Sequence, residues 1–230
     1  MAEAIKRAEI YGIGMVSVNH SNHFGMAATY VLQALQANMI SLVFTSSAKQ
    51  MPPFGGKETP LGIAPFAAGA PSNREVPYIL DIAPSTPMSP QRKYGSDRRT
   101  KGLGSGIAIL MDIMSSVLTV AGFGGQVGDR YKDAKPQDAG HCFIAIKPDV
   151  CFSVDDLKAR MDTLVQRVHG VIPAPGFSEV LFPGEPEQRL CLQRRREGIP
   201  YADAERKMFT ESAKQYGVPE LLLSETPLSV

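Results

Sequence analysis

An alternation of strand-like and helix-like segments near the start of the chain most constrains its fold. The apolar run Ile13–Val18 predicts a buried strand, His23–Ala37 carries apolar residues at helical spacing, and Ile40–Thr45 predicts a second strand. Strand, helix and strand in this order favour an α/β fold with a parallel strand pair. Three later apolar runs have the character of strands: Val76–Ile82, His141–Ile146 and Glu179–Phe182.

Helix-like segments separate and follow these runs. Residues 2–9 predict an N-terminal helix, and Ser105–Ala121 is so apolar that we expect it to be a buried helix. Ser153, with two acids after it, is a plausible N-cap for a helix that ends near Val168. Two helices, Pro186–Glu197 and Tyr201–Tyr216, close the chain.

The order of segments predicts one domain over residues 1–230. We expect a core at about 10–185 and C-terminal helices at about 186–220, which gives an α/β fold with a mixed sheet and flanking helices. The polar, basic stretch Pro84–Lys101 reads as a surface loop that is poorly packed.

Composition excludes several classes of partner. A net charge of +1 gives no reason to expect nucleic acid or an anionic membrane, and we find no apolar run of about 18 residues that could span a bilayer. The three cysteines, Cys142, Cys151 and Cys191, have no CxxC spacing, which argues against a disulfide framework or a zinc site. The N-terminus lacks the apolar core of a signal peptide, so we expect a cytoplasmic protein.

A polar cluster follows the first predicted strand. His20 and His23 lie with Asn19, Ser21 and Asn22 where strand gives way to helix, and histidine is the side chain best suited to moving protons near neutral pH. A histidine in this position also serves as a helix cap or a satisfied structural group. The residues alone leave both interpretations open.

Two glycine-rich stretches do not make a dinucleotide fingerprint. That motif needs a strand before the glycines and a helix after them. Gly102–Gly106 follows a charged loop and Gly122–Gly125 follows a predicted helix. The sequence therefore predicts no Rossmann-type dinucleotide site at either stretch.

Two acids stand where a strand ends. Asp81 closes an apolar run, and Glu185 follows the turn Pro183–Gly184. Each carboxylate can face a ligand at the edge of a sheet, and each can equally cap a helix or a turn.

Six short segments, in order along the chain, resemble the malate/L-lactate dehydrogenase family, which includes ureidoglycolate, sulfolactate and 2,3-diketogulonate-type oxidoreductases. The matching segments, together with Arg189 and Arg196–Ile199, are Gly12–Gly25, Phe44–Ser47, Pro60–Pro65, Leu80–Ala83, Ser105–Asp112 and Phe182–Glu185. The resemblance covers roughly residues 5 to 220.

The resemblance implies an oxidoreductase that transfers hydride between NAD or NADP and a small 2-oxo or 2-hydroxy acid. It also implies a fold that is not of the Rossmann type. His23, in the segment Asn-His-Phe-Gly, takes the position of the proton donor and acceptor. The positions that line the cofactor in the family fall on Ser47, Asp81, Ile82, Ala83, Pro183, Gly184 and Glu185.

The chain also departs from the family pattern. An N-terminal helical region with a Ser-His-Gly segment is absent, and the insert between Pro87 and Lys101 is shorter. An alternative hypothesis is therefore a catalytically inactive remnant that acts as a binding or subunit-interface module. We also expect a homodimer, because a second copy would cover the apolar helix Ser105–Ala121.

Overall fold

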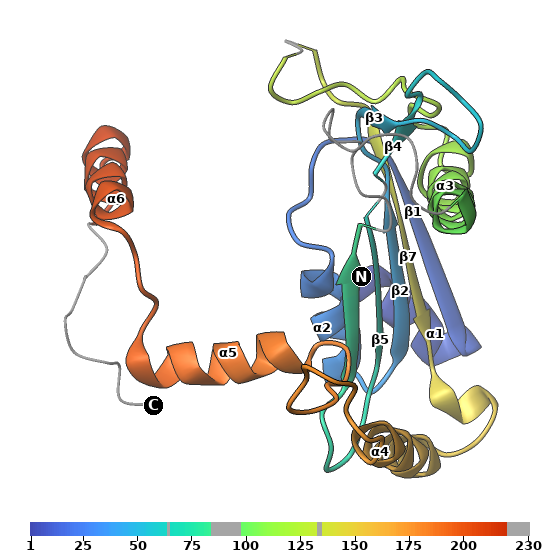
Figure 1. Cartoon of the computed structure of the whole chain (residues 1–230). Coiled ribbons are helices and arrows are strands. Elements are labelled where there is room, and N and C mark those ends of the chain that lie inside the picture. Colours follow the sequence, from blue (N-terminus) through green and yellow to red (C-terminus); the bar gives the residue numbers. More distant parts are fainter. Residues whose placement is uncertain (64, 84–97, 133–134, 220–230) are drawn as a thin grey trace. The chain divides into compact units, whose positions relative to one another are not determined.

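The computed structural model describes residues 1–63, 65–83, 98–132 and 135–219 (Figure 1). The chain forms two compact units, Met1–Gly184 and Glu185–Val230, which are described separately. The elements of the first unit are α1 (Ala2–Tyr11), β1 (Ile13–Ser21), α2 (Ala28–Gln36), β2 (Ile40–Thr45), β3 (Lys49–Met51), β4 (Leu61–Gly62), β5 (Phe66–Ala70), β6 (Tyr78–Ile82), α3 (Arg98–Asp112), the π-helical turn η1 (Ile113–Val117), β7 (Ala139–Ile146), the 3₁₀ turn η2 (Pro148–Val150) and α4 (Val154–His169).

Five strands form the central sheet in the order β1-β7-β2-β5-β6. The sheet and its flanking helices confirm the expected α/β class. Each hydrogen-bonded pair in this sheet is antiparallel, so the expected mixed sheet with a parallel pair is wrong. The reason is that β7, almost a hundred residues further along the chain, lies between β1 and β2. Strands β1, β2 and β6 consequently run in the same direction without pairing with one another.

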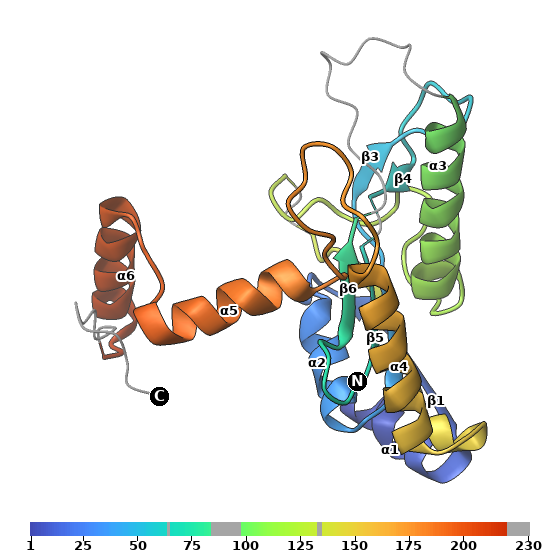
Figure 2. The same cartoon turned by 60° about the horizontal axis from the view of Figure 1, so that its bottom comes forward.

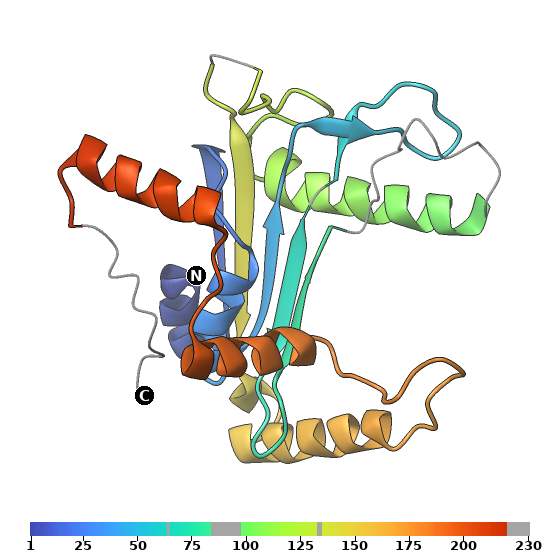
Figure 3. The same ribbon diagram turned by 60° about the vertical axis from the view of Figure 1, so that its left-hand side comes forward.

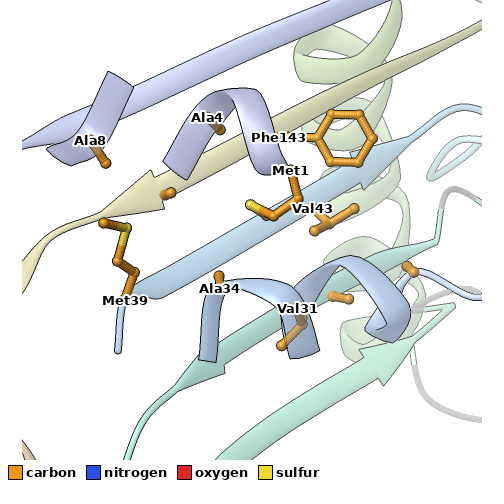
Figure 4. Packing of buried hydrophobic residues seen from close by; sticks show 11 residues of the cluster. Met1, Ala4, Ala8, Val31, Ala34, Met39, Val43 and Phe143 are labelled. Carbon is orange, nitrogen blue, oxygen red and sulfur yellow. The ribbon is translucent and has the colours of Figure 1, made fainter. Parts of the chain in front are cut away.

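One face of the sheet is covered by α1 and α2. Their small side chains, among them Ala4, Ala8 and Ala34, pack on Val43 and Phe143 of the central strands (Figure 4). Because side chains alternate along a strand, the neighbours Phe44 and Cys142 face the other way and join a second cluster under α3.

Helix α3 and η1 cross the strands on that second face (Figures 2 and 3). Ala108 and Met111 are buried there, whereas Leu110, Val117 and Leu118 are about half exposed. The expectation of a buried Ser105–Ala121 helix is therefore wrong, because a helix that packs on one sheet buries only one of its sides. The helix also begins earlier, at Arg98, so the end of the expected Pro84–Lys101 loop is helical, while 84–97 lies outside the described residues.

Two glycines allow helices to approach the sheet closely. A Cβ at Gly14 of β1 would lie 1.9 Å from the carbonyl oxygen of Ala4 in α1, and one at Gly140 of β7 would lie 1.8 Å from that of Ser115 in η1. Any side chain at either position would collide with main-chain atoms, so both helix contacts require glycine.

Other boundaries differ from the predictions for local reasons. The predicted helix His23–Ala37 begins only at Ala28, after an irregular loop, and Asn38 follows it with the positive φ of 55° that suits the end of a helix. The segment Glu179–Phe182 is not a strand.

Helix α4 lies at the end of the sheet opposite the carboxyl end of β1. Ser153 accepts a hydrogen bond from the N–H of Asp156, as expected of an N-cap, and the Asp162 carboxylate accepts the main-chain N–H groups of Asn73, Arg74 and Glu75 in the β5–β6 turn.

The second unit contains α5 (Glu185–Glu197) and α6 (Asp203–Tyr216), close to the two helices predicted there. Gly217 ends α6 in the left-handed conformation. That the whole chain acts as one domain stays a prediction. In the part of the chain that the structure describes, no helix has the length and apolar character needed to cross a bilayer.

Candidate active site at the carboxyl ends of β1, β2 and β6

The topology gathers most of the predicted site residues at one end of the sheet, next to β3 in Figure 1. His23 follows β1, Ser47 follows β2, and Asp81–Ala83 includes and follows the end of β6. Because these three strands run the same way, their carboxyl ends share one edge. The amino end of β7, at Ala139, lies at that edge as well.

His23 lies in the irregular loop between β1 and α2, with its side chain exposed. Its Nδ1 accepts a hydrogen bond from the N–H of Gly25 at 3.1 Å, which places the proton of the neutral ring on Nε2. Its main-chain N–H donates to the side-chain oxygen of Gln137 at 2.9 Å. The ring does not cap α2, which begins five residues later.

A second histidine, His141 of β7, contacts the loop between β1 and α2. His141 of β7 is only 2% exposed, and its ring stacks on Phe24 with centroids 4.4 Å apart. Its Nε2 donates to the carbonyl oxygen of Asn22 at 3.1 Å, and its Nδ1 lies 2.8 Å from the hydroxyl of Thr45. Burial lowers the pKa of His141, the bond to the Asn22 carbonyl opposes this effect, and the nearby His23 ring adds to it whenever that ring is charged. His141 is therefore a neutral structural group.

His20 forms a separate pair with the segment before β7. Its Nδ1 lies 2.7 Å from a carboxylate oxygen of Asp138, and both residues have positive φ, 51° and 55°. The pairing of β1 with β7 is irregular at this point, between Val18 and Ser21. His20 therefore pairs with Asp138 at the irregular end of β1, whereas His23 lies in the loop that follows the strand.

Asp81 has a structural contact that the sequence left open. One carboxylate oxygen accepts the main-chain N–H of Ala28, the first residue of α2, at 2.8 Å. Asp81 thus caps a helix 53 residues away in the chain. Ile82 and Ala83, which follow it, are exposed at the end of the edge strand β6, and Ser47 is half-buried beside β4.

The remaining predicted residues lie elsewhere. The carbonyl of Pro183 accepts the N–H of Ile79 near the start of β6, and Gly184, with a φ of 90°, packs on Ile79. Both residues therefore flank the outer edge of β6 and lie away from its carboxyl end. Glu185 begins α5 in the second unit, where it is buried and forms an ion pair with Arg189 at 2.7 Å.

Cys142, next to His141, is not a nucleophile. Burial raises the pKa of its thiol to about 11, so the thiol is protonated at neutral pH.

Sequence reasoning did not identify Gln137 or Asp138 as parts of this site. Both precede β7, and the insertion of β7 between β1 and β2 brings Asp138 to His20 and Gln137 to the loop 22–27 between β1 and α2, called the histidine loop below. Nothing local in the sequence marks such long-range pairing.

The fold and the gathered residues define an α/β protein whose polar strand ends share one edge, and comparison with known proteins gives the family. A family model described as malate/L-lactate dehydrogenase matches residues 1–90 and 99–209. The chain therefore belongs to the malate/L-lactate dehydrogenase family.

Individual relatives agree with this assignment. Over 85% of this chain, the sequence is 29% identical to the L-sulfolactate dehydrogenase of Methanocaldococcus jannaschii. Over 88% of this chain, it is 26% identical to the ureidoglycolate dehydrogenase (NAD(+)) of Escherichia coli O157:H7. It spans only 64% and 66% of those two proteins. The structure of malate dehydrogenase from Pyrococcus horikoshii superposes with a TM-score of 0.85 at 26% identity, covering 96% of this chain and 70% of that one.

Proposed function

We propose that the chain is an NAD(P)-dependent oxidoreductase that acts on a small 2-oxo or 2-hydroxy acid, with His23 as the group that exchanges a proton with the substrate oxygen. The observation that carries this proposal is the exposed His23 side chain at the same sheet edge as Ser47 and Asp81–Ala83. Family membership supports it, since the relatives are named as dehydrogenases of malate, sulfolactate and ureidoglycolate.

The donors and acceptors at this edge suit a nicotinamide cofactor. The Ser47 hydroxyl, the Asp81 carboxylate and the exposed main chain of Ile82 and Ala83 offer the hydrogen-bonding groups that ribose hydroxyls and a carboxamide require. We propose that Ser47, Asp81, Ile82 and Ala83 hold the cofactor. When bound, the nicotinamide supplies or accepts the hydride.

The contacts of His23 suggest how it handles the proton. The Gly25 N–H holds Nδ1 as an acceptor, so the resting neutral ring offers an Nε2–H donor to a carbonyl oxygen. A doubly protonated ring must release Gly25, because Nδ1–H cannot accept a hydrogen bond. Reduction of the 2-oxo acid therefore starts from the doubly protonated ring, which gives its Nε2 proton to the new hydroxyl and is left neutral with its remaining proton on Nδ1. Oxidation runs the other way and returns the proton to Nε2.

Binding and turnover test this function. Purified protein is mixed with NADH and then NADPH, and nicotinamide fluorescence is followed, which also decides between the two cofactors. Oxidation of malate, sulfolactate and ureidoglycolate and reduction of pyruvate and oxaloacetate are assayed in parallel. We expect enhanced fluorescence and turnover of at least one acid. Fluorescence without turnover of a wider panel of 2-oxo acids would favour the inactive binding module instead.

A further inference from the structure

Gln137 connects the histidine loop to the segment around Gly128 through hydrogen bonds. It lies two residues before β7, and all four of its hydrogen-bonding groups are used. Its side-chain oxygen accepts the N–H of His23 at 2.9 Å, and its main-chain N–H donates to the Asn22 side chain at 3.2 Å. Its side-chain N–H donates to the carbonyl of Gly128 at 3.2 Å, and its own carbonyl accepts the Gly128 N–H at 2.8 Å.

These contacts hold the main chain of the histidine loop from one side, while His141 holds the Asn22 carbonyl from the other. In the described part of the chain, the His23 ring forms one hydrogen bond, the local one with the Gly25 N–H. An exposed ring with one local hydrogen bond is oriented mainly by its own backbone. The position of Nε2 therefore depends on the bond between the His23 N–H and Gln137.

We propose that Gln137 is a positioning residue for proton transfer by His23, an inference that rests on the proposed function. It does not touch the reacting atoms. Its side-chain oxygen fixes the main chain from which the imidazole projects. Because a displacement of about 1 Å in a reacting group can lower a rate about 100-fold, the loss of this one acceptor should affect catalysis.

Two nearly isosteric substitutions separate the two side-chain contacts. Gln137→Met removes the acceptor for His23 and the donor for Gly128. Gln137→Glu keeps the acceptor, removes the donor and adds a negative charge. Both variants thus lose the bond to Gly128, and only Gln137→Met also loses the bond to His23. Gln126→Met is the matched control, because within the described residues the Gln126 side chain bonds only to the N–H of Phe123 in its own loop.

We expect Gln137→Met to lower kcat about 10- to 100-fold while the KM and the NADH affinity change less than about threefold. Gln137→Glu should retain kcat within about threefold, and Gln126→Met should match the wild type. Equal losses in Gln137→Met and Gln137→Glu would overturn the proposal, because the Gly128 contact would then be responsible. Wild-type kcat in Gln137→Met would overturn it as well.

A second readout needs no activity. The protein has four histidines, so the ring nitrogens of His23 can be assigned by NMR in the protein without ligands. We expect the Nε2–H tautomer in the wild type and in Gln137→Glu, and a mixture of tautomers in Gln137→Met. An unchanged tautomer in Gln137→Met would contradict the positioning role. If the wild type lacks turnover, the proposed function fails while this measurement still decides the role of Gln137.

Slow hydrogen exchange of the His23 amide in the wild type is the test that remains if Gln137→Met does not fold. The bond to Gln137 predicts protection of this amide, and exchange at the rate of an open loop would overturn the inference.

Discussion

Two helical segments press on the central sheet through a glycine, and they differ in what lies around the contact. Under α1, Gly14 adjoins a core of small apolar side chains, including Ala4 and Ala8. Under η1, Gly140 precedes His141 and exchanges hydrogen bonds with Ser46, whose hydroxyl accepts the Gly140 N–H at 2.9 Å. The close contact at Gly14 thus lies in the hydrophobic core, whereas the close contact at Gly140 lies beside the candidate site.

The π-helical turn belongs to this second contact. The N–H groups of Leu118 and Ala121 bond to carbonyls five residues earlier, Ile113 and Ser116. Ser115, whose carbonyl meets Gly140, lies within the turn, and π-helical turns are frequent at functional sites. The irregular helix therefore lies over the strand that carries His141.

Substitution of the two glycines tests the comparison with the largest expected effects. Gly140→Ala places a methyl group 1.8 Å from a main-chain oxygen and should destabilise the protein by about 3 kcal/mol. It should also lower kcat per folded molecule about tenfold or more, because the strand that supports the histidine loop must shift. Chemical unfolding and kinetics corrected for the folded fraction measure the two effects.

Gly14→Ala is the matched variant on the other face. Its methyl group would lie 1.9 Å from the Ala4 carbonyl oxygen, so we expect a similar loss of stability, again about 3 kcal/mol. The kcat per folded molecule should stay within about twofold of the wild type. An equal loss of kcat in both variants would remove the distinction between the two contacts.

Asp81 separates stability from cofactor binding. Asparagine can still accept the Ala28 N–H, so Asp81→Asn should change the free energy of unfolding by less than about 0.5 kcal/mol, whereas Asp81→Ala should lower it by about 1 kcal/mol. If the carboxylate also holds the cofactor, both variants should weaken NADH binding in a fluorescence titration. Unchanged NADH affinity in Asp81→Asn would leave Asp81 only its capping role.

The neutral state of His141 predicts the pH dependence of stability. Its pKa is lowered in the folded protein, mainly by burial, so the unfolded chain binds more protons between this pKa and the ordinary value of about 6.5. The contribution of neutral His141 to the free energy of unfolding is fully present above about pH 6.5 and is lost as the pH falls toward the pKa of His141 in the folded protein. Each unit of difference corresponds to about 1.4 kcal/mol.

Chemical unfolding at several pH values measures this slope. His141→Phe keeps a ring beside Phe24 but cannot titrate, so its stability should fall less steeply on acidification than that of the wild type.

The outer side of α3 and η1 tests the expected homodimer. Leu110 and Val117 are 49% and 51% exposed, and a second copy that covers them would be displaced by Leu110→Lys or Val117→Lys. We expect the wild type to be a dimer and these variants monomers by light scattering, with stability of the fold changed by only about 0.5 kcal/mol. Gln33→Lys, on the exposed side of α2, should remain dimeric. A monomeric wild type would contradict the expectation.

Local patterns predicted most elements, because strand and helix periodicity is written in consecutive residues. The N-cap at Ser153 was accessible in this way. The position of β7 was not, since pairing between distant strands leaves no local mark. The late start of α2 has the same origin, because its cap, Asp81, comes from another strand.

The candidate site was predictable only in part. His23, Ser47 and Asp81–Ala83 were identified through the family resemblance, and the topology places them at one sheet edge. Gln137 has no recognisable motif, and its four hydrogen bonds become visible only when the loop before β7 lies against the histidine loop.

The most direct test of the proposed function is kcat per folded molecule for the wild type, His23→Ala and His20→Asn at saturating nicotinamide and 2-oxo acid. Asparagine suits the positive φ of residue 20, so this control loses only the His20 imidazole and its bond to Asp138. We predict a loss of about 10²- to 10⁴-fold in His23→Ala with NAD(P)H binding retained, and a change below about threefold in His20→Asn. Wild-type turnover by His23→Ala would contradict the assignment of His23 as the proton donor and acceptor.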